Sequence, residues 1–176
     1  MLAYLNQAHM GSYQAALNNP IRPADVEITR EYHQKYGFGL NLEQELAKNV
    51  GVFARLGWSD GQNEAWAFAD VDRAATAGVS IKGEPWRRPN DTLGVANAVN
   101  AISSAHRQFL AAGGTGILAG DGALSYGLED ALETYYDFQI CKTLHAALDY
   151  QFVVNPAYNR DRGPVSIFGA RVHWEF

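Results

Sequence analysis

Long apolar runs, repeated cysteines and an excess of positive charge are all missing from this chain of 176 residues. Apolar runs such as the one in Gln151–Val154 stay far below the ~18 residues that a membrane helix needs, which excludes a transmembrane helix. The single cysteine, Cys141, excludes an internal disulfide and a zinc site built from several cysteines. With 14 Lys and Arg against 19 Asp and Glu, the net charge of −5 argues against a nucleic-acid or anionic-lipid surface as the main partner.

The N-terminus also lacks a secretory signal, which would begin with positive charge and continue into an apolar core of ~7–15 residues. Met1–Leu5 leads directly into polar residues, and the first cation is Arg22. We therefore expect either a cytoplasmic chain or a chain whose original start is missing.

What the sequence does contain is alternation of apolar and polar residues, the pattern of half-buried β-strands. The predicted strands are 1–12, 35–42, 50–59, 75–82, 91–101, 133–140, 144–154 and 165–176, and short helices are predicted at 12–17 and 103–112. The connections alternate between long (13–26, 60–73, 102–128, 155–164) and short (43–49, 84–90, 141–143). This order predicts an all-β, antiparallel up-and-down sheet of about eight strands, with tight turns at one rim and long loops at the other.

Alternation alone does not distinguish a membrane barrel, whose apolar face meets lipid, from a soluble sandwich or lipocalin-like barrel, whose apolar face forms the core. Three features favour the membrane barrel. The polar phase contains many small residues, which suit a lumen. An eleven-residue strand, tilted, covers about 25 Å of membrane. Aromatic side chains lie near strand ends, where they could form interfacial girdles: Tyr36, Trp58, Tyr150, Trp174 and Phe176.

The C-terminal strand has apolar residues at every second position and ends on an aromatic one. Phe168, Val172, Trp174 and Phe176 belong to this apolar phase. The pattern resembles the assembly signal of bacterial outer-membrane barrel proteins. It leads us to expect contact with outer-membrane lipid and, during assembly, with the barrel-assembly machinery.

Four segments resemble the carbohydrate-selective porins of the OprB family, in the same order along essentially the whole chain. They are 36–44 (YGFGLNLEQ), 53–60 (FARLGWSD), 103–113 (SSAHRQFLAAG) and 149–165 (DYQFVVNPAYNRDRGPV). The resemblance implies a Gram-negative outer-membrane porin of roughly 16 strands that admits mono- or oligosaccharides by passive diffusion. Residues 1–176 are then expected to be the C-terminal part of a single porin barrel domain, a truncated fragment without a signal peptide whose curved sheet stays open.

If the apolar phase faces lipid, the other phase lines the lumen. The candidate sugar contacts on it are Arg55, Lys82, Glu133, Tyr135, Asp137, Asp149, Gln151 and Arg171. Arg donates hydrogen bonds to hydroxyls, Asp, Glu and Gln accept them, and aromatic rings cover the apolar side of a sugar. Because both charge signs are present, the wall suits a neutral polar solute better than an ion. The long segment 102–128 is the candidate for narrowing the channel.

Motifs for other chemistry are weak. Residues 114–119 fit a loose dinucleotide-binding loop, but no helix follows them. Ser125 is one residue out of step with a nucleophile elbow, and the five histidines lack metal-binding spacing. We therefore predict no enzyme activity, no catalytic residue, no metal and no cofactor. A soluble lipocalin-like β-barrel that binds a small ligand stays open as the alternative function.

Overall fold

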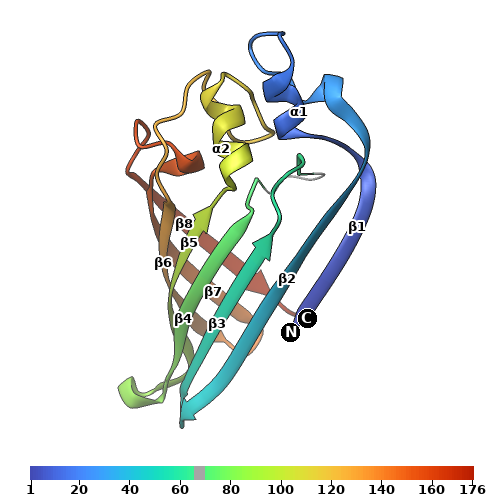
Figure 1. Cartoon of the computed structure of the whole chain (residues 1–176). Helices are drawn as coiled ribbons and strands as arrows, with labels where there is room; N and C mark the ends of the chain where they lie inside the picture. Colours follow the sequence, from blue (N-terminus) through green and yellow to red (C-terminus); the bar gives the residue numbers. More distant parts are fainter. Residues whose placement is uncertain (66–69) are drawn as a thin grey trace.

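The computed structural model describes residues 1–65 and 70–176 and consists mainly of one antiparallel sheet (Figure 1). Its eight strands lie side by side in chain order. They are β1 (Leu2–Gly11), β2 (Arg30–Ala47), β3 (Val50–Ser59), β4 (Arg73–Gly83), β5 (Arg88–Ala101), β6 (Glu129–Cys141), β7 (Leu144–Val154) and β8 (Val165–Trp174). The all-β up-and-down prediction is confirmed.

The strand connections follow the predicted alternation of long and short. The short turns are 48–49, 84–87 and 142–143, and the long connections are 12–29, 60–72, 102–128 and 155–164. Within the long connection 60–72, residues 66–69 lie outside the described residues. One of the three short turns carries the single-turn 3-10 segment η2 (Glu84–Trp86), and the other two contain no helical residues. Two further 3-10 segments, η1 (Glu27–Thr29) and η3 (Pro156–Tyr158), lie in long connections.

Both short helices also form where the sequence predicts them, as α1 (Tyr13–Asn18) and α2 (Ser104–Ala111). Each begins after a serine whose hydroxyl accepts a hydrogen bond from a backbone N–H of the first turn. Ser12 caps α1 and Ser103 caps α2, and this satisfies N–H groups that a helix start otherwise leaves unpaired. No helix among the described residues is both long and apolar enough to cross a membrane.

Most strands differ from their predicted bounds by a few residues: β2, β4, β5 and β6 begin two to five residues earlier than predicted, and the far ends of β2 and β8 also differ. β2 extends to Ala47, because its polar residues 43–45 continue the backbone ladder with β3, Glu43 lying opposite Phe53. Ladder hydrogen bonds need no apolar side chains, so a polar stretch that reads as a turn remains a strand. β8 ends at Trp174, although the N–H of Glu175 still donates to the carbonyl of Thr143 at 2.9 Å.

The strand register keeps the two side-chain phases on opposite faces of the sheet. Directly opposed residues share a face. Val52 lies opposite Val79, and Tyr150 opposite Phe168, whereas Arg55 lies opposite Thr76. The apolar face therefore extends from β2 to β8, with a few polar residues within it, such as Asn97 between Ala77 and Leu132. It is largely exposed: Phe168 is 80% exposed and Val172 71%.

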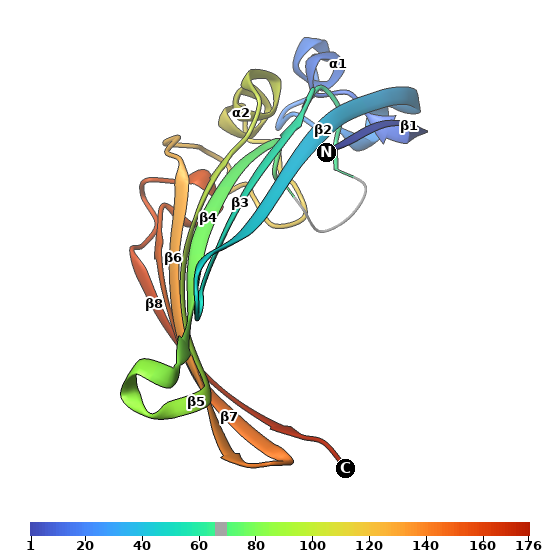
Figure 2. The same cartoon turned by 90° about the horizontal axis from the view of Figure 1, so that it is seen from below.

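The sheet is curved and open (Figure 2). β1 and β8 form its two edges, and among the described residues each is hydrogen-bonded to one neighbouring strand, β2 and β7 respectively. The charged phase lies on the concave face and the apolar phase on the convex face. The expectation of an open curved sheet is confirmed.

The hydrophobic core lies in the long connections at one rim and not within the sheet. Its buried members are Tyr13, Ala16, Ala24, Val26, Ile102, Ala105, Phe109, Leu110, Ala119 and Tyr158. We call this assembly of α1, α2 and the neighbouring connections the rim cap; both helices lie at the same end of the sheet (Figure 1). Its formation by three separate connections was not foreseen from the sequence.

Substitutions on β8 test the assignment of the two faces. Val172 lies on the convex face, whereas Gly169 lies on the concave face opposite Asp149. Replacing Val172 with Arg is expected to cost about 2–4 kcal/mol of folding stability in lipid, because the cation enters hydrocarbon. Gly169→Arg should cost less, since its side chain meets water and a carboxylate. Urea titration of folding into vesicles measures both, and equal penalties would contradict the assignment.

Candidate functional site

The candidate site is the concave polar face. The register places all eight predicted sugar-contacting residues on it: Arg55 on β3, Lys82 on β4, Glu133, Tyr135 and Asp137 on β6, Asp149 and Gln151 on β7, and Arg171 on β8. That they share a face follows from the ladders. That they contact sugar stays a prediction.

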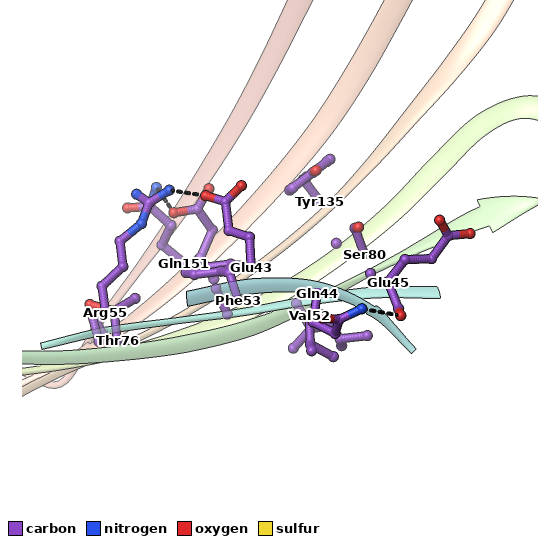
Figure 3. Close-up of a pocket in the computed structure, with 18 residues that line it drawn as sticks. Glu43, Gln44, Glu45, Val52, Phe53, Arg55, Thr76, Ser80, Tyr135 and Gln151 are labelled. Carbon is purple, nitrogen blue, oxygen red and sulfur yellow. Dashed lines mark hydrogen bonds and ion pairs between the residues drawn. The ribbon is translucent and has the colours of Figure 1, made fainter. Parts of the chain in front are cut away.

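A hollow of about 760 Å³ lies on this face, lined by residues of β2 through β7. Four of the predicted residues line it, namely Arg55, Glu133, Tyr135 and Gln151. Figure 3 shows the side chains of Arg55, Tyr135 and Gln151 on the same side of the ribbons as Glu43, with Val52 on the other side. A second hollow of about 360 Å³ is lined by Glu133, Tyr135, Asp149 and Arg171. Lys82 and Asp137 line neither of these two hollows.

Arg55 is oriented by its neighbours on β2 and β3. Its Nε donates to Oδ1 of Asn41 at 3.1 Å, and its Nη2 donates to Oε1 of Glu43 at 3.3 Å. The guanidinium carbon also lies 5.1 Å from the centre of the Phe53 ring. The guanidinium has more N–H donors than these two contacts use. Arg55 is therefore held in one orientation and still has N–H groups with which to donate hydrogen bonds into the hollow.

Acceptors gather on β6 and β7. The side-chain amide of Gln151 donates to Oε2 of Glu133 at 3.3 Å, and Lys82 donates to Oγ1 of Thr92 at 3.0 Å. Asp137 contacts Nδ1 of His145 at 2.9 Å and lies 4.0 Å from Arg171. The same hollow thus offers donors such as Arg55 and acceptors such as Glu133 and Gln151, which suits a solute carrying hydroxyl groups.

Two glycines on the concave face each lie beneath an aromatic ring of the adjacent strand. Gly78 lies opposite Phe53 and Gly94 opposite Tyr135. A Cβ added at Gly78 would lie 2.5 Å from the Phe53 ring, and one at Gly94 would lie 2.2 Å from the Tyr135 ring. Each ring therefore lies over the backbone of its neighbour, as in the aromatic rescue of strand glycines. The small residues that suggested a lumen have this second, structural role.

A buried ionic cluster fastens the rim cap to the wall. Oδ2 of Asp72 accepts a hydrogen bond from the N–H of Ser103 at 2.8 Å and contacts Nδ1 of His106 at 3.2 Å. Oδ1 of Asp72 lies 3.8 Å from Nζ of Lys35. Three elements meet here: β2, the connection 60–72 and α2. Asp72 and His106 are almost completely buried.

The charge state of this cluster follows from its contacts. Burial alone would raise the pKa of the Asp72 carboxyl, but the hydrogen bonds from His106 and Ser103 and the charge of Lys35 together hold that pKa below its usual value. Nε2 of His106 is buried with no hydrogen-bond partner among the described residues, which favours the proton on Nδ1, donating to Asp72. The ring of Tyr13 stacks on His106 at 4.4 Å, and burial raises the pKa of this phenol.

Sequence reasoning missed this cluster, and it also missed Glu43 and Phe53 as lining residues of the hollow. Asp72 and His106 are separated by 34 residues and meet only because two long connections pack together. Glu43 was assigned to a turn. Among the described residues, no group of three or more His, Cys, Asp or Glu side chains is placed to hold a metal ion.

Such a sheet, apolar on its convex face, charged on its concave face and with tight turns at one rim, is the wall of a β-barrel of the porin type. The chain belongs to the carbohydrate-selective porin, OprB family, whose family model matches residues 1–176.

Among solved structures, the chain is similar to the high-pH structure of Pseudomonas putida OprB, with a TM-score of 0.78 and 18% sequence identity. The match covers 99% of this chain and 43% of that one, so the chain spans less than half the length of this relative. At this identity, the likeness shows the fold. The comparison with curated proteins found no match.

Two matched glycine substitutions test whether the Tyr135 ring packs against the backbone at Gly94. Gly94→Ala is expected to displace the Tyr135 ring and to cost about 1–3 kcal/mol, as other insertions of a methyl group into close contacts do. Gly57→Ala is the control on the same face, because its added Cβ would lie 3.9 Å from Ala74. Near-ultraviolet circular dichroism and urea titration report both effects. If Gly94→Ala changed the spectrum and the stability no more than Gly57→Ala does, the packing of Tyr135 against Gly94 would be contradicted.

Removal of the buried carboxylate tests the fastening of the rim cap. Asp72→Asn is expected to destabilise the cap by about 3 kcal/mol, since it leaves Lys35 and His106 without their anion. Hydrogen exchange of the α2 amides should accelerate accordingly, while Asp161→Asn, at an exposed site in another long connection, should leave it unchanged. Similar exchange in the two variants would argue against the cluster.

The pH dependence of the same exchange follows from the lowered pKa of Asp72. A carboxyl whose folded pKa is lowered stabilises fully above its unfolded pKa of about 3.9 and loses this contribution as the pH falls through the folded value. Protection that depends on Asp72 should therefore persist at mildly acidic pH and disappear only below about pH 4. A loss centred well above that range would show that another group controls the cap.

Proposed function

We propose that this chain forms part of the wall of a bacterial outer-membrane channel through which mono- or oligosaccharides diffuse passively. The observation that carries the proposal is the polar hollow of about 760 Å³ on the concave face of a sheet whose convex face is apolar and exposed. Membership in the carbohydrate-selective porin family supports the class of solute. The family is one of channels, and we propose no catalytic residue.

The proposed solute contacts divide by chemistry. Arg55 would donate to sugar hydroxyls, and Glu133 and Gln151 would accept from them. Tyr135 would offer a ring face to the apolar side of the sugar. Lys82, Asp137, Asp149 and Arg171 complete the set on the same face, as water-lining or solute-contacting groups outside or at the margin of the larger hollow. Both charge signs are present, which supports a neutral solute.

The convex face is proposed to meet outer-membrane lipid. Its apolar phase continues through β8, and the stacked Phe38 and Trp58 rings lie 5.4 Å apart toward the rim of long connections, while Trp174 and Phe176 lie 6.2 Å apart toward the short turns. These positions suit two interfacial girdles. With Phe168 and Val172, Trp174 and Phe176 are also proposed as the assembly signal read by the barrel-assembly machinery. Residues 1–176 are proposed to lie within a single barrel domain.

The alternative of a soluble lipocalin-like carrier is disfavoured by the sheet itself. Such a carrier needs a closed barrel with its apolar face inside. Here the apolar face is convex, and β1 and β8 are not paired with each other in the described residues. Partition between buffer and detergent separates the two functions, because a monomer that is soluble without detergent would exclude the wall of a membrane channel.

A chimeric barrel tests the proposed function directly. Residues 1–176 would replace the matched segment of Pseudomonas putida OprB, and sugar entry into vesicles would be measured. We expect the chimera to admit a neutral monosaccharide. When the chimera is placed in planar bilayers, Arg55→Gln should weaken sugar block of the current by about tenfold, the equivalent of one charge-assisted hydrogen bond. Lys142→Gln, in a short turn far from the hollow, is the control; equal effects would contradict the role of Arg55.

The isolated chain should not conduct. Sheet edges in lipid leave backbone groups unpaired at several kcal/mol each, so a spanning sheet must close. An eight-stranded barrel has an interior just wide enough for its own side chains, whereas this concave face carries long side chains such as Arg55 and Arg171. Planar bilayers with the purified chain are expected to show no regular current steps. Steps blocked by added sugar would show that the chain closes by itself or with a second copy.

A further inference from the structure

The two rims of the wall carry opposite charge. The long connections contain eight acidic and four basic residues, whereas the three short turns contain one acidic and three basic residues. Each short turn supplies one of these cations: Lys48, Arg87 and Lys142. We call these three turns with Arg88, the first residue of β5, the basic rim.

Two cations of the basic rim are not neutralised by the protein. Lys48 pairs with Glu84 at 2.7 Å, and Arg88 pairs with Asp91 at 2.8 Å. Arg87 and Lys142 are exposed, and within residues 1–65 and 70–176 neither forms an ion pair with an acidic side chain. Arg87 is held in the left-handed region with φ of 64°, so the turn geometry fixes where its side chain begins.

An aromatic belt adjoins the basic rim on the apolar face. Nε1 of Trp86 donates to the hydroxyl of Tyr136 at 2.9 Å, and this hydroxyl donates to Oδ2 of Asp91 at 2.6 Å. The ring of Phe138 follows, 6.3 Å from that of Tyr136. Tyr136 and Phe138 belong to the apolar phase. Trp and Tyr with a polar atom in such a setting prefer the boundary between hydrocarbon and headgroups.

We propose that the basic rim binds the headgroups of anionic phospholipids, with Arg87 and Lys142 as the principal contacts and Trp86 as the anchor at the hydrocarbon boundary. Charge complementarity and continuity with the apolar convex face point to a lipid surface. Cations next to an aromatic belt lie at the depth of the phosphates, where anionic lipid attracts each Lys or Arg. The proposal rests on the proposed placement of the convex face in a membrane.

Lipid titration of the full chain in zwitterionic micelles tests the proposal. Short-chain phosphatidylglycerol or phosphatidylcholine is added, and the indole N–H signal of Trp86 is followed by nuclear magnetic resonance. We expect saturable shifts with a severalfold preference for phosphatidylglycerol. The double variant Arg87→Gln/Lys142→Gln should bind phosphatidylglycerol about tenfold more weakly, and the charge-conserving Arg87→Lys/Lys142→Arg should retain the preference.

The matched control removes two cations from the opposite rim, as Arg22→Gln/Arg160→Gln, and should leave the preference unchanged. Equal binding of both lipids by the unmodified chain, or an equal loss in the control, would overturn the proposal. So would equal shifts with free glycerol phosphate, because they would show a site for a soluble anion. A chain that enters micelles without lipid preference refutes only the basic rim, whereas a chain that stays in buffer refutes the membrane placement as well.

Discussion

Backbone hydrogen bonding between neighbouring strands is the constraint on which this structure depends. The side-chain period of a strand is two, so a slip by one residue would exchange the two faces. From β1 to β8 the ladders keep the same phase, apart from register shifts beside the three short turns, at Glu45/Ala47, Lys82/Gly83 and Gln139/Cys141. The exposed apolar face, the polar hollow and the aromatic belts are therefore all consequences of one consistent register. Because the sheet itself contains no hydrophobic core, core packing within the sheet does not favour one strand register over another.

The wall and the rim cap are held together by different forces. On the concave face, side chains are ordered mainly by one another, as Arg55 is by Asn41 and Glu43. The rim cap buries apolar side chains such as Phe109 and Leu110, as a small soluble domain does. Asp72 links the two parts with a buried carboxylate whose partners come from β2 and α2. The long connections are thus fixed against the wall by a few specific contacts.

Most of the fold could be predicted because local signals carry it. Period-two alternation identifies the strands, and Ser12 and Ser103 mark the helix starts by their capping hydroxyls. The end of β2 could not be predicted, because the consecutive polar residues 43–45 break the alternation and are kept in the sheet by pairing with β3. Alternation also predicts that Arg55, Glu133 and Lys82 share a face. It does not predict which of them share a hollow, because that depends on the stagger between strands.

The contact of Asp72 with His106 could not be predicted from local sequence signals either. It requires two long connections to fold back toward the same strand ends, and nothing local in either segment specifies this. The basic rim is different, since its cations are visible in the sequence once the short turns are known. Their common location becomes meaningful only when the sheet places all three turns at one rim.

The seating of rings on glycines has a consequence for how such walls change over evolutionary time. Phe53 and Gly78, or Tyr135 and Gly94, occupy one volume between them, so neither partner can be enlarged alone. A lineage that loses the ring gains room at the glycine, and a lineage that fills the glycine must give up the ring. The two members of each pair are therefore expected to change together, whereas an exposed residue of the concave face such as Arg55 carries no such packing constraint. The inner surface of the wall can thus acquire new polar groups while its aromatic positions stay where they are.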